Sequence, residues 1–222
     1  MISTLRTHLI KDLRIELRSL DAFVSMLFFS LLVVVLFSIA FDPHGDFSRD
    51  IAGGVLSVAT MFASVSALNQ AWAREIRHQV IDAQRMAPSS GAELYLAKVI
   101  ANFLFVTIVQ IILAPIFLIM YNLHIEGQAW LLAVVLPLGT WALVGNGVFF
   151  AALSIRSRNR ELLLSLILFP IFIPALLAMV RATTSILTGD GDPNLWIKLL
   201  FGYDIIFTTT SLLLFDVVFH AE

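Results

Sequence analysis

The histidines and cysteines give this chain no recognisable site for metal or nucleophilic chemistry. His8, His44, His78, His124 and His220 are scattered without the short ligand spacing of a metal-binding motif. The chain has no cysteine, which excludes disulfides and thiolate chemistry. No nucleophile has a base at a suggestive spacing. We therefore predict no metal site and no catalytic residue.

Nucleotide chemistry is not expected either. The chain contains no G-x-x-x-x-G-K-[ST] loop, the motif whose backbone N–H groups and lysine hold the phosphates of ATP. None of the polar segments is long enough to form a separate soluble domain. The sequence thus indicates a protein that is not an enzyme.

The composition shows what surrounds the polar residues. Of 222 residues 59% are hydrophobic and 14% are charged, and the mean hydropathy of +0.91 is far above a soluble average. A helix of roughly 20 apolar residues crosses a bilayer. Six blocks have about this length, at residues 23–41, 51–72, 94–121, 130–155, 162–180 and 199–219. They lack the strict alternation of barrel strands, so we predict an all-α membrane protein with six transmembrane helices.

Few polar side chains fall within these spans. Asp204 is the one acid clearly inside a predicted span, one to two turns from its outer end, and such acids are costly unless they are paired or hydrated. Three roles would account for Asp204: contact with a polar partner, a place on the exit side of a pathway, or a side chain that simply reaches the interface. Asn69 and Gln110 are predicted to bridge helices by hydrogen bonds of about 0.5–2 kcal/mol each. Pro170 and Pro174 predict a kink in the fifth span.

Residues 1–22 are predicted to form a unit of their own before a six-helix domain of residues 23–222. Apolar residues recur there every three or four positions, at Ile2, Leu5, Leu9, Leu13, Leu17 and Leu20. Lys11, Arg14 and Arg18 lie opposite this stripe. The pattern is typical of an amphipathic helix in the headgroup plane, in contact with membrane lipid. An ordinary soluble cap helix is the alternative.

The distribution of Lys and Arg predicts the orientation. Of the 14 such residues, all but Arg49, Arg181 and Lys198 fall on the side of the two termini. Short cytoplasmic loops carry the positive excess, so both termini are expected in the cytoplasm. The net charge of −2 gives no reason to expect a nucleic-acid partner.

The segment "REIRHQVIDAQRMAP", residues 74–88, lies between spans two and three on the predicted cytoplasmic side. One face of the predicted helix carries Ile76, Val80, Ala83 and Ala87, and Pro88 ends it. Ser90 and Glu93 then have the S-x-x-E spacing of a capping box at the start of the next helix. The pattern indicates a short surface helix that joins the next span through a sharp corner.

Such a helix is suited to docking in a partner's groove, so that the partner's movement displaces the following span. We interpret it as a coupling helix; a solvated connector is the alternative. The residues assigned to this contact are Arg74, Glu75, Ile76, Arg77, Val80, Asp82, Arg85 and Pro88.

Four motifs carry a resemblance to a known family. They are "AGGVLSVATMFASVSALNQAWARE" (residues 52–75), "MAPSSGAELYLAK" (86–98), "RSRNRELLLSLILFPIFIP" (156–174) and "GYDIIFTTTSLLLFDVVF" (202–219). Together with the six spans, they resemble the ABC-2 type permease subunits, and most closely the haem exporter protein B (CcmB) family of cytochrome c maturation. Two positions depart from the usual pattern. His78 and Gln79 stand where an acidic residue and a glycine are usual, and Ser57 and Val58 stand where a tryptophan is usual.

The resemblance implies a multi-pass subunit of the bacterial inner membrane that pairs with a separate ABC ATPase, to which ATP hydrolysis would belong. It also implies haem-handling membrane proteins and a periplasmic haem chaperone as partners. Haem would be a substrate rather than a stably bound cofactor. The permease is expected to form a homodimer or to pair with another membrane subunit.

The spans themselves favour force transmission over haem carriage. Haem needs axial ligands such as histidine or methionine, and the predicted spans contain no histidine. Their methionines, Met26, Met61, Met120 and Met179, are more typical of packing. An ABC-2 permease for a drug, lipid or polysaccharide, a secondary transporter and a membrane scaffold are the alternatives.

Overall fold

The computed structural model describes residues 2–41, 46–86, 90–123, 127–156 and 159–220, which contain helices and no strand. Six helices in this part are long and apolar enough to cross a membrane, which confirms the predicted fold class. They are α2 (Asp21–Ala40), α3 (Asp46–Ala71), α6 (Gly91–Met120), α7 (Leu132–Leu153), α8 (Arg160–Thr188) and α9 (Pro193–His220). The shorter elements are α1 (Ile2–Ser19), α4 (Ala73–Arg77), α5 (Ile81–Met86), η1 (Ala129–Leu131) and η2 (Ser154–Arg156).

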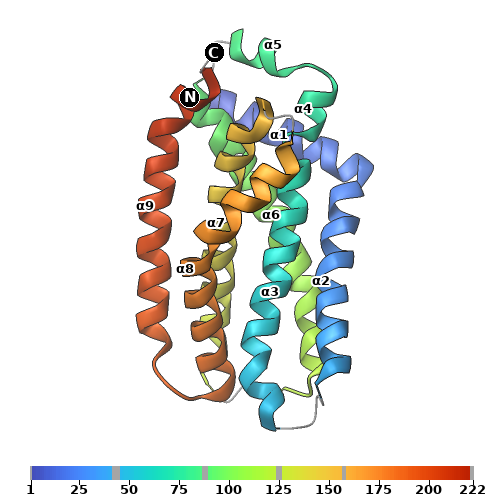
Figure 1. The fold of residues 1–222 in the computed structure, drawn as a ribbon, viewed down its shortest axis with the longest axis vertical. Helices are drawn as coiled ribbons and strands as arrows, with labels where there is room; N and C mark the ends of the chain where they lie inside the picture. Colours follow the sequence, from blue (N-terminus) through green and yellow to red (C-terminus); the bar gives the residue numbers. More distant parts are fainter. Residues whose placement is uncertain (1, 42–45, 87–89, 124–126, 157–158, 221–222) are drawn as a thin grey trace.

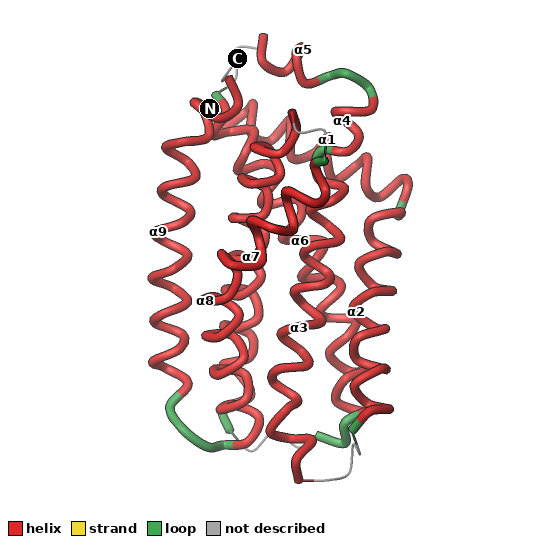
Figure 2. Tube along the Cα trace, viewed as in Figure 1, coloured by secondary structure: helices red, strands yellow, loops and turns green. Residues whose placement is uncertain are grey.

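The six long helices run side by side along the long axis of the molecule (Figure 1). The helix α1 lies across one end of the bundle, where α4, α5 and both ends of the chain are also found. The end of α2, the start of α3 and the connection from α8 to α9 lie at the opposite end (Figure 2). The bundle therefore has one end that carries α1, α4 and α5, and one where the described residues form loops and the single short turn η1.

The helices α3 and α7 form the centre of the bundle. The helix α3 packs against α2, α6, α7 and α8, and α7 packs against α3, α6, α8 and α9. Close approach requires glycine at Gly53, where an added Cβ would lie 2.5 Å from the backbone nitrogen of Thr184 on α8. The helices α2 and α9 have most of their surface exposed. Exposed large apolar side chains are most numerous on these two outer helices, and α6 and α8 carry further ones.

Helix ends follow local capping rather than hydropathy. The helix α6 begins at the predicted cap, where the Ser90 hydroxyl accepts from the Glu93 backbone N–H at 3.3 Å. The helix α8 runs to Thr188 and ends at Gly189, whose positive φ of 77° is a common C-terminal conformation. Both helices extend beyond the apolar blocks, because apolar residues mark only the part of a helix within the hydrocarbon core.

The observed start of α9 gives the position of Asp204 along its helix. The helix begins at Pro193, six residues before the predicted span. At a rise of 1.5 Å per residue, Asp204 lies about 16 Å along the axis from the first residue, or roughly three turns. Asp204 therefore lies near the middle of the helix α9, and its depth below the membrane surface stays a prediction.

The other intramembrane residues have different surroundings. Gln110 is buried, and its Nε2 donates to Thr60 Oγ1 at 3.1 Å, which joins α6 to α3. Asn69, which was predicted to bridge helices, is exposed two residues before the end of α3, on the side away from the buried Leu68. The helix α8 continues through Pro170 and Pro174.

Candidate functional site

The segment predicted as one helix is divided into two short helices. The helix α4 ends at Arg77 and α5 begins at Ile81. Between them Gln79 has a φ of 54°, in the left-handed region that favours glycine. Gln79 N–H donates to the Ile76 carbonyl at 3.2 Å, and Val80 N–H donates to the Glu75 carbonyl at 3.0 Å. These bonds close a turn, so the single-helix prediction was wrong.

The turn also corrects which side chains face outward. Ile76 packs against the hydrophobic core, and Ile81 is buried in it. Val80 is 39% exposed and Met86 is 82% exposed. Ile76 and Val80 therefore do not share one outward face, because the left-handed residue between the two short helices breaks the helical phase.

The remaining outward residues of this segment are Ala83 and three polar residues. Arg77, His78 and Gln79 are exposed. Pro88, and the side chains of Arg74, Asp82 and Arg85, lie outside the part of the chain that the structure describes. We call the surface formed by residues 77–80 and Met86 the outer face of α4–α5.

Glu75 was assigned to the partner contact, but it points into the molecule. Its side chain is only 8% exposed. Its Oε1 accepts from Lys98 Nζ at 2.8 Å and from Lys11 Nζ at 3.2 Å. A buried carboxylate needs such counter-charges, since desolvation otherwise opposes ionisation. Glu75 therefore joins α4 to α6 and α1.

Lys98 is the residue that sequence reasoning missed. It is 2% exposed, and its Nζ also donates to the Ala71 carbonyl at 2.8 Å and lies 3.6 Å from Asp12 Oδ2. The same Nζ lies 4.4 Å from the centre of the Trp72 ring, within the range of a cation–π interaction. The sequence signal was a single lysine early in a long apolar helix, which had been counted only as a positive loop charge.

The helix α1 supplies the other two charges. Lys11 Nζ lies 3.1 Å from Asp12 Oδ1, so Lys11 faces inward and not opposite the apolar stripe as predicted. Burial acts to lower the pKa of Lys11, but the Asp12 and Glu75 carboxylates outweigh it and hold that pKa above its ordinary value. We call Lys11, Asp12, Glu75 and Lys98 the four-residue ion network. It links α1, α4 and α6.

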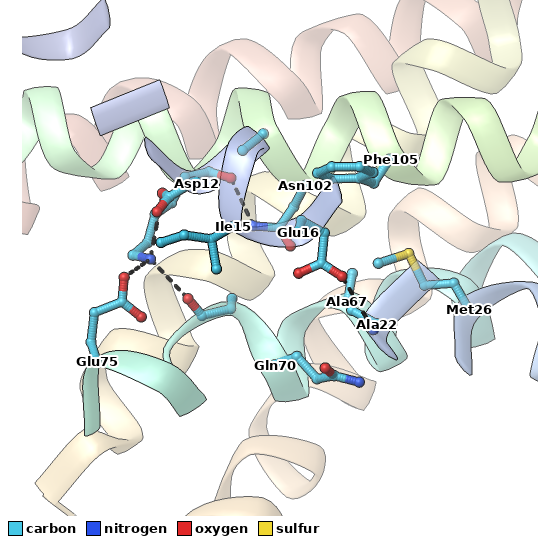
Figure 3. A pocket seen from close by; sticks show the side chains of 13 residues that line it. Asp12, Ile15, Glu16, Ala22, Met26, Ala67, Gln70, Glu75, Asn102 and Phe105 are labelled. Atoms are coloured by element: carbon cyan, nitrogen blue, oxygen red, sulfur yellow. Dashed lines mark hydrogen bonds and ion pairs between the residues drawn. The ribbon is translucent and has the colours of Figure 1, made fainter. Parts of the chain in front are cut away.

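A polar cavity of about 50 Å³ adjoins this network, between α1, α2, α3 and α6. Asp12, Glu16 and Glu75 line it together with Gln70 and Asn102 (Figure 3). Glu16 Oε1 accepts from the backbone N–H of Ala22 at 3.1 Å, which connects the end of α1 to the start of α2. The space is large enough to hold water.

Trp72, the residue between α3 and α4, extends the connection across the bundle. Its Nε1 donates to the Val148 carbonyl of α7 at 3.4 Å. Its ring stacks on Phe215 of α9, with ring centres 6.3 Å apart, and lies near Phe219. The segment after α3 is therefore in contact with α1, α6, α7 and α9, and a displacement of it would act on several helices at once.

Asp204 is remote from this region. It is buried near the middle of the helix α9, whereas the ion network lies at the end of the bundle that carries α1. The structure thus separates the predicted site residues into two groups.

The comparison with protein families decides what the fold represents. The model of the CcmB protein family matches residues 3–218, which is nearly the whole chain. The chain belongs to the CcmB family. This CcmB-family chain, with its six spans, is a multi-pass membrane protein.

Named relatives cover most of this CcmB-family chain. Heme exporter protein B of Paracoccus denitrificans is 32% identical over 175 residues, which is 78% of this chain and 79% of the relative. The Rhodobacter capsulatus protein of the same name is 30% identical over 173 residues, again 78% and 79%. Heme exporter protein B of Pseudomonas aeruginosa is 28% identical over 181 residues, which is 82% of this chain and 81% of the relative.

Proposed function

We propose that this chain is the membrane subunit of an ATP-driven ABC-type complex that exports haem, or delivers it to a periplasmic chaperone, in c-type cytochrome biogenesis. The name "Heme exporter protein B" of its relatives supports the substrate. The chain itself would bind no nucleotide. A separate ABC ATPase would hydrolyse ATP, and other haem-handling membrane proteins would complete the complex in the bacterial inner membrane.

The observation that carries the proposal is the position of α4 and α5. Their outer face presents Val80 and Met86 beside Arg77 and His78, which suits a groove with an apolar floor and a polar rim. Behind that face, Glu75 is bonded to α6 and α1. A push from the ATPase on the outer face would reach these helices through the four-residue ion network.

The rigidity of this connection supports coupling over a solvated connector. Among the described residues, Lys98 contacts Ala71, Glu75 and Asp12, which belong to three different segments. The opposite charges hold these segments together. A loop without function would not need a buried lysine for its attachment. The role expected of the chain is therefore force transmission, with α6 and the residues around Trp72 as the first parts to move.

The test uses the complex in native membranes. Changing Val80 and Met86 together to Asp should reduce co-purification of the ATPase at least tenfold, equivalent to about 1.4 kcal/mol, because two exposed apolar contacts become charged. The yield of haem-loaded chaperone should fall with it. Asn159→Asp is the matched control, since Asn159 is exposed elsewhere on the chain and the substitution adds a single charge.

Two outcomes would contradict the proposal in different ways. Normal ATPase binding by the double variant would remove the coupling role from α4–α5. Undiminished haem loading of the chaperone in cells that lack this chain would instead exclude the haem function, whatever the ATPase binds.

A further inference from the structure

A buried polar layer joins α7, α8 and α9 near the middle of the bundle. The Tyr203 hydroxyl on α9 donates to the Ile171 carbonyl on α8 at 2.8 Å. The same hydroxyl accepts from Asn146 Nδ2 on α7 at 3.0 Å, and that Nδ2 also donates to the Ala142 carbonyl at 2.9 Å. The layer is thus held by hydrogen bonds between all three helices.

Asp204 directly follows Tyr203 on α9 and differs from the hydrogen-bonded members of this layer. Its side chain is 7% exposed, on the buried stripe of α9 that also contains Leu200 and Ser211. Neither carboxyl oxygen has a hydrogen-bond partner among the described residues, and Asn146 Oδ1 also lacks one there. Buried polar atoms in native proteins are rarely left in this state.

Charged groups on the neighbouring helices do not provide a counter-ion. The helix α7 contains no charged residue. The other helices that pack against α9 carry few described charged side chains, and so does α9 itself. Each of these side chains either lies toward one end of the bundle or is exposed. They are Glu93, Lys98, Arg181, Lys198 and Asp216. An ionised, unpaired acid within a span is costly. The neutral acid avoids this cost.

We propose that Asp204 is a proton-binding site, in which the carboxyl group holds a proton from water while α9 packs against α7 and α8. The proton adds an O–H donor to a layer with unpartnered oxygen acceptors. A metal cation would instead need about six oxygen ligands, and no group of three His, Cys, Asp or Glu that could hold one occurs among the described residues. This inference does not depend on the coupling role of α4–α5.

Proton binding makes the packing of α9 sensitive to pH. Release of the proton leaves a buried charge, which is favourable only if α9 moves enough to admit water or a polar partner. Acid therefore favours the packed state, and alkali favours separation of α9 from α7 and α8.

The decisive measurement is infrared difference spectroscopy on the full chain in lipid nanodiscs. At neutral pH, the spectrum should contain the carbonyl band of a protonated carboxyl group, and Asp204→Asn should lose that band completely. Asp190→Asn is the control, because Asp190 is an exposed loop acid; it should keep the band. Alkaline buffer should remove the band from the wild type. A spectrum without any protonated carboxyl at neutral or mildly acidic pH would overturn the proposal.

Two further measurements keep the test valid if a variant does not fold. Wild-type protein with ¹³C-labelled aspartate should show one carboxyl resonance that titrates well above the others, without any mutation. The resonance should be the same in sodium and potassium buffers. A sodium-dependent shift would assign the site to a metal ion and would refute proton binding.

Discussion

Lys98 illustrates how one buried charge organises a region of the molecule. A lysine so far from solvent is tolerated because Glu75 accepts from it at 2.8 Å, the Ala71 carbonyl accepts a second bond, and the Trp72 ring faces its ammonium group. Its contacts come from residues far apart in the sequence. The loss of Lys98 would therefore leave Glu75 with Lys11 as its one described counter-charge.

Replacing Lys98 by Met should destabilise the protein by about 3 kcal/mol, the lower end of the range for breaking a buried ion pair. The cost stays at that end because Lys11 still contacts Glu75. Thermal unfolding in mild detergent measures the effect. Adding Glu75→Leu should recover at least half of the loss, and Lys198→Met, at an exposed lysine, should change little. If Lys98→Met and the wild type unfolded at the same temperature, the four-residue ion network would not contribute to stability.

Gln79 provides a second test at the scale of one residue. Its φ of 54° costs roughly 1–2 kcal/mol for a residue with a Cβ, and glycine is usual at this position in the family that the sequence resembles. Gln79→Gly should therefore raise stability by about 1 kcal/mol, while Gln79→Val should lower it. The two unfolding midpoints should lie on opposite sides of the wild-type value; a lower midpoint for the glycine variant would contradict the strained turn.

The helices themselves were the most predictable part of the molecule. Six apolar blocks gave six spans, because burial in lipid depends on composition over about 20 residues and not on tertiary contacts. The Ser90 cap was also predictable, since its partner Glu93 is three positions away. Information of this kind is local in the sequence.

The errors concern interactions between distant segments. Helical periodicity placed Lys11 on the outward face of α1, but Glu75, 64 positions away, draws it inward. The same periodicity predicted a single helix that included Gln79, but the backbone turns at this residue. The helix α9 begins six residues before the predicted span, because the polar residues at its start do not continue the apolar block. Such features depend on partners that a local pattern does not contain.

The contact of α3 with α8 tests the packing of two elements. Gly53→Ala should destabilise the protein by about 1–3 kcal/mol, because the new Cβ would meet the Thr184 backbone. Gly54→Ala is a close control, since its nearest neighbour there is Val180 Cγ1 at 3.9 Å, and a helical alanine is about 0.5–1 kcal/mol better than glycine. The unfolding midpoint should fall for Gly53→Ala and rise for Gly54→Ala. If both midpoints moved in the same direction, the close contact of α3 with α8 at Gly53 would be contradicted.

At the scale of the whole molecule, polarity is concentrated at one end. The helices α1, α4 and α5 and both chain ends share that end (Figure 1), while the described residues of the opposite end form connections between spans. The excess of Lys and Arg on the side of the termini predicts that this end faces the cytoplasm.

Cysteine labelling tests this orientation without background, because the chain has no cysteine. In sealed cells, Asp190→Cys should react with an impermeant maleimide added outside, and His78→Cys should react only after the membrane is opened. Both positions are exposed, so access to the reagent depends on the side of the membrane. Labelling of position 78 in sealed cells would reverse the topology.

The start of α6 has a consequence for biosynthesis. The Gly91 N–H at this helix terminus donates to the Asp216 carboxylate, 125 positions later in the chain. At about 5–20 residues per second, a ribosome needs roughly 6–25 s to travel that distance. The N-terminus of α6 must therefore wait for an acceptor that is translated 125 positions later. Until Asp216 is translated, the third span has its local Ser90 cap but its Gly91 N–H lacks the carboxylate that ties it to the sixth span.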